Sequence, residues 1–344
     1  MVNNIKDLEK ILGKIETVES LASVEVMPTG LMGLDSKVLH GGLPRGRYIE
    51  LYSKESSGKS TVALFLVSMV QKLGGRCVWF ESEGTLTKEY AEQCGVDTSS
   101  LEIVRDFTTG EDCLYKVKQR LALDIYDLIV LDSNTKLIPE YLREAKAEKH
   151  SQYDNLQAAK MNADFFRSLS GFEIRDINGN LIKSDKVYFQ GTTRKETWHK
   201  LSDKKTCMVF IFHAVDDLSA LSPGAVTTAG GGASKFEASI RLALKLRGTE
   251  KDSKGNLIYK KIDVIAPKNK MGPPFGYTRL LLYTDGRIEE ECGDEILIDL
   301  GINKKIIEQS GGWFTIGTER FQGKKATIAY INNNLDLKNE ILRG

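Results

Sequence analysis

The apolar positions of this chain follow two different repeats. Three short, nearly continuous apolar runs occur at residues 77–80, 128–131 and 208–212. Apolar residues recur every three to four positions in three other stretches, at about 87–94, 110–123 and 152–170. Strands that are buried on both faces read as continuous apolar runs, and helices between them cover a parallel sheet. The pattern therefore predicts an α/β fold with a mainly parallel central sheet flanked by helices.

The second half of the chain has a different pattern. Residues 240–246 and 257–265 look like the arms of a hairpin around the turn Asp-Ser-Lys-Gly-Asn, and residues 176–182 hold a similar turn. From about residue 294 the alternation of short apolar stretches predicts a small α+β region.

The N-terminal residues 3–19 carry apolar side chains at helical spacing. This helix is expected to pack either on its own domain or on a neighbouring subunit, and the sequence favours neither. We expect an N-terminal helix or oligomerisation segment over residues 1–30, a core over 31–287 and a small C-terminal α+β domain over 288–344.

A further strand, at residues 48–52, leads through a small-residue loop into Gly58-Lys59-Ser60 and an apolar helical run. This order is typical of a P-loop, where backbone N–H groups and the helix dipole bind a polyphosphate. Lys59 is expected to reach the outer phosphates, and the Ser60 hydroxyl is expected to bind Mg²⁺. The expected nucleotide-binding residues of the loop are Ser53, Glu55, Ser56, Ser57, Gly58, Lys59, Ser60 and Thr61. Ser53 stands where the motif usually has its first glycine, and the alternative is a serine-rich turn.

Polar side chains follow the apolar strands. Asp132 ends a Walker B pattern and is expected to support Mg²⁺, directly or through a water molecule. Glu83 is expected to orient the water that attacks the γ-phosphate. Glu81 is the alternative for that role, and both acids could equally be solvated loop residues. Because ligands bind at the carboxyl ends of parallel strands, these acids and His213 are expected to surround the nucleotide.

Three further segments carry candidate chemistry. Residues 214–232 are small and nearly uncharged, which predicts a long loop that cannot order itself and that either binds phosphates or is plain surface. Lys268 and Lys270 are two positions apart on an extended chain, so both side chains project to the same side. They are expected either to bind an anion that a partner supplies or to form a solvated edge. Residues 183–205 hold seven basic residues, three acidic residues and interleaved aromatics. This composition suits single-stranded nucleic acid or a solvated hairpin.

Composition narrows the class of protein. The chain of 344 residues can form one large domain with small additions, and its net charge of +1 means that any DNA-binding surface is local. The five cysteines lack metal-site spacing and are expected to be reduced and mostly buried. Neither a signal peptide nor an apolar run of about 18 residues is present, which predicts a soluble, cytoplasmic protein without a membrane partner.

These motifs together make the chain resemble the RecA-type homologous recombinases, from about residue 24 to residue 334. The most specific stretches are Pro-Thr-Gly-Leu-Met-Gly-Leu-Asp at 28–35, Gly-Gly-Leu-Pro-Arg-Gly at 41–46, Glu-Ser-Ser-Gly-Lys-Ser at 55–60, Thr-Ala-Gly-Gly-Gly-Ala-Ser-Lys-Phe at 228–236 and Pro-Lys-Asn-Lys at 267–270. The resemblance implies a RecA-like P-loop core that uses ATP and Mg²⁺. It also implies a helical filament of copies on single-stranded DNA, which pairs with homologous duplex DNA and exchanges strands in recombination and repair.

The resemblance also assigns roles to individual residues. Glu83 matches the catalytic glutamate, Tyr90 and Thr87 match the adenine contacts, and His213 matches the position that senses the γ-phosphate. Lys268 and Lys270 match lysines that reach the ATP of the adjacent protomer, and Phe236 matches an interface residue. Two DNA-binding loops are implied near 143–152 and 214–232; their candidate residues are Arg143, Lys146, Lys149, Thr227, Thr228, Gly230, Gly231 and Gly232. Single-strand-binding or loading proteins are implied as further partners.

Some features depart from the family pattern. Ser53 is expected to restrict the turn at the first glycine position, since glycine alone reaches left-handed conformations freely. His213 replaces a residue that is usually Gln in cellular members, which points to a diverged, phage-encoded member. Residues 172–205 resemble an insertion. Two alternatives to a recombinase stay open: a RecA-fold DNA-dependent ATPase acting as motor or mediator, and a nucleotide-gated coat on single-stranded DNA.

Overall fold

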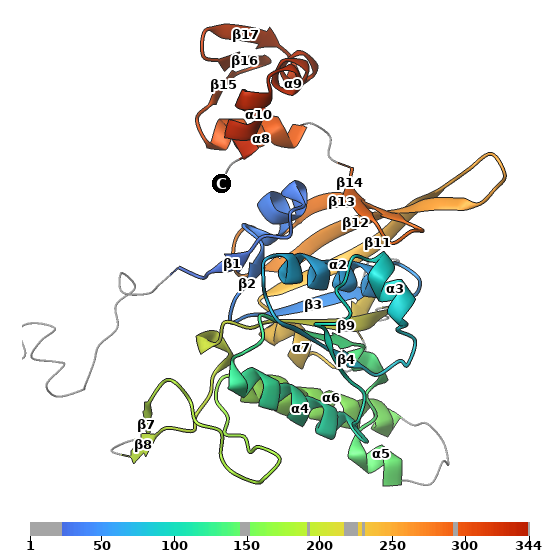
Figure 1. Ribbon diagram of the computed structural model, residues 1–344, viewed down its shortest axis with the longest axis vertical. Helices are drawn as coiled ribbons and strands as arrows, with labels where there is room; N and C mark the ends of the chain where they lie inside the picture. The colour runs from blue at the N-terminus through green and yellow to red at the C-terminus, as the bar shows by residue number, and fades with distance from the viewer. Residues whose placement is uncertain are drawn as a thin grey trace, which may run out of the picture.

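A large twisted sheet organises the computed structural model, which describes residues 23–144, 152–190, 193–216, 226–228, 231–291 and 295–342. The strand order is β14-β13-β12-β11-β3-β9-β6-β4-β5, and β10 pairs with β9 (Figure 1). Six neighbouring strands are parallel: β5 (Glu102–Val104), β4 (Cys77–Glu81), β6 (Leu128–Asp132), β9 (Cys207–Asp216), β3 (Tyr48–Ser53) and β11 (Ile240–Lys251). The prediction of a mainly parallel sheet is confirmed.

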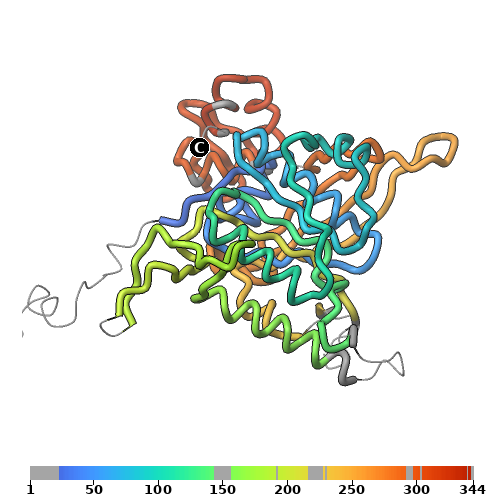
Figure 2. Tube along the Cα trace, turned by 60° about the horizontal axis from the view of Figure 1, so that its bottom comes forward, coloured from blue at the N-terminus to red at the C-terminus, as the bar shows by residue number. Residues whose placement is uncertain are grey.

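The rest of this sheet is antiparallel. It consists of β12 (Leu257–Asn269), β13 (Gly276–Tyr283), β14 (Ile288–Glu290) and the short β10 (Val226–Thr228). The backbone N–H of Asp252 donates to the carbonyl of Asn256, which closes the expected hairpin turn between β11 and β12. Asp176 and Asn180 make the same backbone contact in the earlier turn. The β11–β12 hairpin projects from one side of the molecule (Figure 2).

Helices cover both faces of the parallel strands. α2 (Lys59–Lys72) and α3 (Lys88–Gln93) lie on one face, and α4 (Gly110–Leu123) and α6 (Gln152–Ser168) lie on the other (Figure 1). Alternate strand residues point to opposite faces, so Ile49 and Leu51 belong to the core under α2. Tyr48 and Tyr52 belong to the core under α4 and α6. Both cores need apolar residues, which explains the continuous apolar runs.

Short elements complete the core region. They are β1 (Val26–Met27), a π-helix at Leu34–Leu39, β2 (Leu43–Pro44), the 3-10 turns Asn134–Lys136 and Leu201–Asp203, α5 (Glu140–Glu144), α7 (Ala233–Glu237), and a small hairpin of β7 (Tyr188–Gln190) and β8 (Thr193–Lys195). The four described cysteines are buried and unpaired. Burial raises the pKa of Cys77 to about 12, so this thiol stays protonated near neutral pH.

The C-terminal residues form their own small α+β unit, as expected. Three antiparallel strands, β15 (Ile307–Ser310), β16 (Trp313–Ile316) and β17 (Glu319–Gln322), pack with α8 (Glu295–Asn303), α9 (Lys324–Asn333) and α10 (Leu335–Leu342). Ile298, Phe314 and Ile331 lie in a separate hydrophobic core. Lys37 of the π-helix pairs with Asp299 at 3.1 Å and links this unit to the main sheet.

Two expectations about the region after residue 208 need correction. His213 was expected to follow a strand, but it lies inside β9, which continues to Asp216. Residues 214–232 were expected to form a loop without order, yet Val226 pairs with Asp216 and Thr228 pairs with Ala214. The backbone hydrogen bonds of this antiparallel ladder hold residues 214–216 and 226–228 together. Residues 217–225 and 229–230 lie outside the described residues.

The expected helix at residues 3–19 also lies outside the described residues, so the choice between its two packing partners stays open.

A charged cluster stabilises the antiparallel half of the sheet. Asp263 on β12 is fully buried and accepts hydrogen bonds from Arg279 Nε at 2.7 Å, from Tyr277 Oη at 3.2 Å and from Arg247 Nε. Burial raises the pKa of Asp263, but the hydrogen bonds from the two arginines outweigh it and lower the pKa overall. The carboxylate therefore stabilises the fold in its charged form.

We predict that Asp263→Asn lowers the free energy of unfolding by about 1–3 kcal/mol, because it leaves two guanidinium groups without their carboxylate. Since the folded pKa is lowered, this contribution is complete above the unfolded pKa of about 3.9 and disappears as the pH falls through the folded value. Chemical denaturation at pH 7 and pH 3 should show the difference between variant and parent shrinking at pH 3. Asp285→Asn, which breaks an exposed pair with Arg287, is the control and should leave stability nearly unchanged.

Candidate functional site

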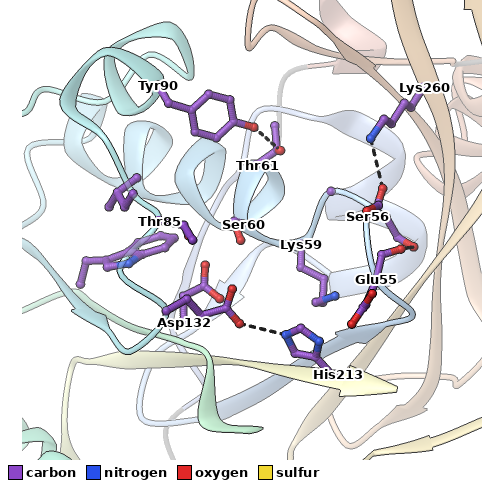
Figure 3. Close-up of a pocket in the computed structure, with 15 residues that line it drawn as sticks. Glu55, Ser56, Lys59, Ser60, Thr61, Thr85, Tyr90, Asp132, His213 and Lys260 are labelled. Carbon is purple, nitrogen blue, oxygen red and sulfur yellow. Dashed lines mark hydrogen bonds and ion pairs between the residues drawn. The ribbon is translucent and has the colours of Figure 1, made fainter. Parts of the chain in front are cut away.

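A pocket of about 410 Å³ opens at the carboxyl ends of β3, β4 and β6, beside the middle of β9 (Figure 3). Its lining residues come from the loop after β3 and the start of α2, from β4 and the segment after it, from α3, from the end of β6, from the middle of β9 and from β12. They are Glu55, Ser56, Ser57, Gly58, Lys59, Ser60, Thr61, Trp79, Glu83, Thr85, Leu86, Tyr90, Asp132, His213 and Lys260. The structure therefore brings together most of the residues that the sequence motifs suggested.

The loop between β3 and α2 has the backbone geometry of a phosphate-binding turn. Gly58 has φ 82° and precedes the first helical residue, Lys59, and Ser56 also has a positive φ of 58°. A Cβ at Gly58 would lie 2.3 Å from Leu282 Cδ2, so glycine is required there for packing and conformation. The start of α2 directs its free N–H groups toward the pocket.

Ser53 does not restrict this turn. It is buried as the last residue of β3 and is not among the residues with positive φ, so its side chain meets no left-handed strain. Its hydroxyl donates to the carbonyl of Lys54 at 2.8 Å and accepts from Lys59. The expectation of a restricted loop was wrong, because the left-handed positions of the loop are Ser56 and Gly58. Ser53 is also absent from the pocket lining.

Lys59 carries the main positive charge of the pocket. Its Nζ donates to Ser53 Oγ at 3.2 Å and to the Lys54 carbonyl at 3.2 Å. Burial lowers the pKa of Lys59, while the nearby carboxylates of Asp132 and Glu83 act in the opposite direction. An anion in the pocket would replace weak carbonyl contacts with a charge-assisted hydrogen bond.

Asp132 ends β6 beside Ser60. The pKa of Asp132 is raised to about 7, chiefly by burial; the like charges of Glu83 and Glu81 act in the same direction, while a hydrogen bond from Ser60 and the charge of Lys59 act against it. A buried carboxylate with a raised pKa lacks a sufficient counter-charge. A divalent cation between Asp132 and the Ser60 hydroxyl would supply that charge through the oxygen ligands that hard cations prefer.

Glu83 is held by two hydrogen bonds. Its Oε1 accepts from Ser133 Oγ at 2.8 Å and lies 2.9 Å from His213 Nε2. Burial raises the pKa of Glu83, but the hydrogen bonds from Ser133 and His213 outweigh it, and the pKa is lowered overall. Glu83 is therefore an ionised acceptor at neutral pH, with a fixed orientation next to the pocket.

Glu81, the alternative to Glu83, is in a different environment. It is buried at the end of β4, accepts from Trp79 Nε1 at 3.0 Å and from the Thr85 N–H at 3.2 Å, and does not line the pocket. Both of its oxygens thus have structural partners that shape the segment after β4.

Tyr90 and Thr87 lie on either side of the start of α3. The Tyr90 hydroxyl is 2.6 Å from Thr61 Oγ1, so the ring covers one side of the pocket (Figure 3). Thr87 caps α3 by accepting the Tyr90 N–H at 3.2 Å, and it is not part of the pocket lining.

The structure adds residues that sequence motifs missed. Lys260 of β12 donates to the Ser56 carbonyl at 3.2 Å, although the two residues are far apart in the chain. Trp79, Thr85 and Leu86 complete the wall beside Tyr90. No local signal distinguishes Lys260 from the other lysines of its strand; only the placement of β12 beside the loop does so.

Lys268, Lys270 and Phe236 lie at the opposite edge of the sheet. Lys268 Nζ donates to the carbonyls of Lys235 and Phe236 at 2.6 and 2.7 Å, and Lys270 Nζ lies 3.3 Å from the Phe236 carbonyl. The two ammonium groups share one side, as expected. The Phe236 side chain is 77% exposed, which leaves a large apolar surface next to two cations.

The candidate DNA-loop residues are only partly described. Lys146, Lys149 and Gly230 lie outside the described residues. Arg143 lies in α5, and Thr227 lies in β10. Thr228 is buried, Gly231 packs against Ala159 of α6, and Gly232 precedes α7.

The arrangement defines a class of protein: a P-loop nucleotide-binding protein with an α/β core. A family model of the RecA N-terminal domain matches residues 1–189 and 176–288, and a model of the RecA C-terminal domain matches residues 295–343. The chain belongs to the RecA family. It is an ATP-dependent DNA recombinase of recombination and repair and a DNA-dependent ATPase, which binds DNA and assembles into filaments.

Individual relatives agree with this assignment. Protein RecA of Kineococcus radiotolerans is 35% identical over 320 residues, covering 92% of this chain and 81% of the relative. Protein RecA of Cytophaga hutchinsonii is 31% identical over 343 residues, covering 98% of this chain and 86% of the relative.

The crystal structure of the RadB recombinase has a TM-score of 0.49 and 14% identity, and covers 77% of this chain and 99% of that chain. Within the described ranges, no helix has both the length and the apolar character of a membrane span.

We predict that Asp132→Asn stabilises the nucleotide-free and metal-free protein by roughly 1–3 kcal/mol at pH 8. Because the folded pKa of Asp132 is raised to about 7, the parent protein loses stability as the pH rises from about 4 toward 7, whereas the amide does not titrate. Denaturation at pH 5 and pH 8 should show the larger gain at pH 8. Equal destabilisation at both values would contradict the raised pKa.

Proposed function

We propose that the pocket binds ATP together with Mg²⁺ and hydrolyses it. The observation that carries this proposal is the gathering of Lys59, Ser60, Asp132 and Glu83 in one pocket at the end of a P-loop. In this proposal, the backbone of residues 55–58 and Lys59 bind the phosphates, and Thr61 keeps its hydrogen bond to Tyr90. Ser60 and Asp132 hold the cation, which neutralises phosphate charge when bound. The uncompensated burial of Asp132 supports this fit.

In the proposed mechanism, Glu83 orients the attacking water. Ser133 and His213 fix its carboxylate, and the lowered pKa keeps it ionised as an acceptor. His213 exchanges its hydrogen bond to Glu83 for one to the γ-phosphate, and so links phosphate binding to the orientation of the base. Tyr90 and Thr87 are the proposed adenine contacts, with Tyr90 in the lining and Thr87 fixing the turn before it.

Glu83→Gln tests the role of Glu83. We expect ATP turnover on single-stranded DNA to fall about 100-fold or more, because an amide is a poor acceptor for the water proton, while ATP binding persists. A phosphate-release assay and binding of a fluorescent ATP analogue measure the two effects. Glu89→Gln, an exposed acid of α3 outside the pocket lining, should turn over ATP at the parent rate. Unchanged turnover in Glu83→Gln would show that another group orients the water.

We also propose that each pocket is completed by a neighbouring protomer. The pocket and the pair Lys268–Lys270 lie at opposite edges of the sheet, so one chain cannot bring them together. A head-to-tail filament places one edge against the other, and then the lysines reach the phosphates while Phe236 packs in the interface.

Mixed filaments test this sharing. Glu83→Gln has a defective pocket with intact lysines, and the double variant Lys268→Ala/Lys270→Ala has the converse defect. An equal mixture should recover about a quarter of the parent ATPase rate, because about a quarter of the head-to-tail junctions combine an intact pocket with intact lysines. Each variant alone should be inactive. No recovery in filaments that electron microscopy shows to be mixed would place the lysines outside the site.

Finer features of the function are proposals of the same kind. We place DNA contacts in the segments around 143–152 and 226–232, with backbone N–H groups and Arg143, Lys146 and Lys149 as donors to phosphate.

Residues 1–30, 31–287 and 288–344 are the proposed units, with 172–205 as an insertion. Single-strand-binding or loading proteins are proposed partners, and the cytoplasm is the proposed location because the substrate is cellular or phage DNA.

A further inference from the structure

The hairpin formed by β7 and β8 has no role in the proposed function. We refer to the described residues 186–190 and 193–200 as the arm. In its register, Tyr188 pairs with Lys195 and Phe189 pairs with Arg194. Directly opposed residues share a face, so the arm has one face with Tyr188 and Lys195 and another with Phe189 and Arg194.

The Tyr188 face is bound to its own chain. The Tyr188 hydroxyl hydrogen-bonds Asp203, Lys186 Nζ lies 2.7 Å from Asp203 Oδ1, and Lys200 Nζ lies 4.7 Å from the centre of the Tyr188 ring. These contacts fix the arm in one orientation. They also reduce the positive charge that this segment offers to single-stranded nucleic acid, because Lys186 and Lys200 have partners within the insertion and Lys204 is buried, donating to the Ala122 carbonyl.

The other face is largely open within the described part of the chain. Phe189 is 70% exposed, Val187 is 40% exposed, and the contact of Arg194 among the described residues is an exposed ion pair with Glu196. Such a pair contributes little and exchanges readily. An exposed aromatic ring beside an arginine is the combination that dominates protein interfaces, and a two-stranded hairpin of this size is marginal without support.

The base of the arm lies at the sheet edge opposite the nucleotide pocket. The Leu201 N–H donates to the Leu169 carbonyl, and a Cβ at Gly46 would lie 3.0 Å from the Lys204 carbonyl, so this base packs beside the start of β3. The Ser239 N–H, just after α7, donates to the Tyr48 carbonyl at the same start. Because β9 and β11 flank β3, the two chain segments enter the sheet about 10 Å apart.

This placement puts the arm on the same edge as Phe236, Lys268 and Lys270. The ends of the candidate DNA segment around 143–152 and the start of the second segment, at Asp216, lie at the opposite edge, beyond β6 and β9. Gly231 and Gly232 lead back along α6 toward Phe236, and α6 with its 17 residues spans about 25 Å between the two edges. In a head-to-tail filament, the arm therefore extends toward the next protomer and away from the edge where the DNA segments begin.

Charge favours the same partner. Residues 183–205 hold seven basic and three acidic residues, whereas the other 321 residues hold 41 basic and 44 acidic residues. Asp106, Glu111 and Glu140 are exposed at the pocket-side corner where α4 and α5 begin; Asp106 pairs with Lys116 at 3.2 Å, and Glu111 accepts the Glu140 N–H. The arm and α5 lie at opposite ends of the layer formed by α4 and α6 (Figure 1), as a contact between successive copies requires.

We propose that the arm is an intersubunit clamp, in which Phe189 and Arg194 dock on the pocket-side edge of the adjacent copy of this chain. The inference rests on the proposed head-to-tail interface. The clamp adds an apolar anchor and a cation outside the nucleotide site, so it strengthens filament cohesion independently of ATP turnover.

Photo-crosslinking tests the clamp. Phe189 is replaced by p-benzoylphenylalanine, filaments are assembled with ATP on single-stranded DNA, and electron microscopy confirms assembly before irradiation. We expect a ladder of covalent protein multimers whose crosslinked peptides come from the pocket-side edge, with the corner around 106–111 and 140–144 foremost. Crosslinks to DNA, crosslinks only within one chain, or no crosslinks in assembled filaments would overturn the clamp. A lack of filaments in the unmodified protein would instead contradict the head-to-tail interface itself.

A second variant gives an independent measure. Phe189→Ala/Arg194→Ala should raise the protein concentration needed for half-assembly on DNA about five- to tenfold, with ATP turnover per assembled protomer unchanged. Leu335→Ala, which removes a side chain of α10 that is 72% exposed, is the matched control and should assemble as the parent does. Assembly of the double variant at the parent concentration would overturn the proposal.

Discussion

Burial of both faces of the parallel sheet is the constraint on which the other features of this structure depend. The apolar residues of β4, β6 and β9 pack under helices on two sides, so a charged side chain within these strands would lose its hydration without compensation. In these three strands, polar side chains are therefore restricted to the ends of β4 and β6 and to the second half of β9. The pocket forms where these positions meet the loop after β3.

The two ends of the strands carry different kinds of charge. The pocket edge combines one buried cation, Lys59, with the carboxylates of Glu83 and Asp132. Their pKa values move in opposite directions, because burial outweighs the Ser60 hydrogen bond at Asp132, whereas the hydrogen bonds from Ser133 and His213 outweigh burial at Glu83. The opposite edge carries Lys268 and Lys270, which have only carbonyl oxygens as partners among the contacts described here. A pocket with excess negative charge and an edge with excess positive charge are complementary surfaces of one chain. Head-to-tail assembly satisfies both.

Local motifs made much of the site predictable. A P-loop needs a strand, a turn and a helix in sequence order, so residues 55–61 could be assigned without tertiary information. Asp132 could be recognised because it directly follows the apolar run of a buried strand, whose end is where an acid can lie. The same reasoning failed where a neighbouring segment changes the local outcome: β10 extends β9 past His213, and the left-handed positions of the loop fall on Ser56 and Gly58 rather than on Ser53.

The amino-acid sequence by itself determined the fold class, the position of the nucleotide loop and the family, because each follows from residues that are close together in the chain. Only the tertiary structure decided which distant groups meet. It brought Lys260 to the phosphate loop and bound Glu83 to both Ser133 and His213. It also placed Lys268 and Lys270 at the opposite ends of the strands from the pocket. These relations depend on strand order and on long-range pairing, which no local pattern of apolar and polar residues encodes.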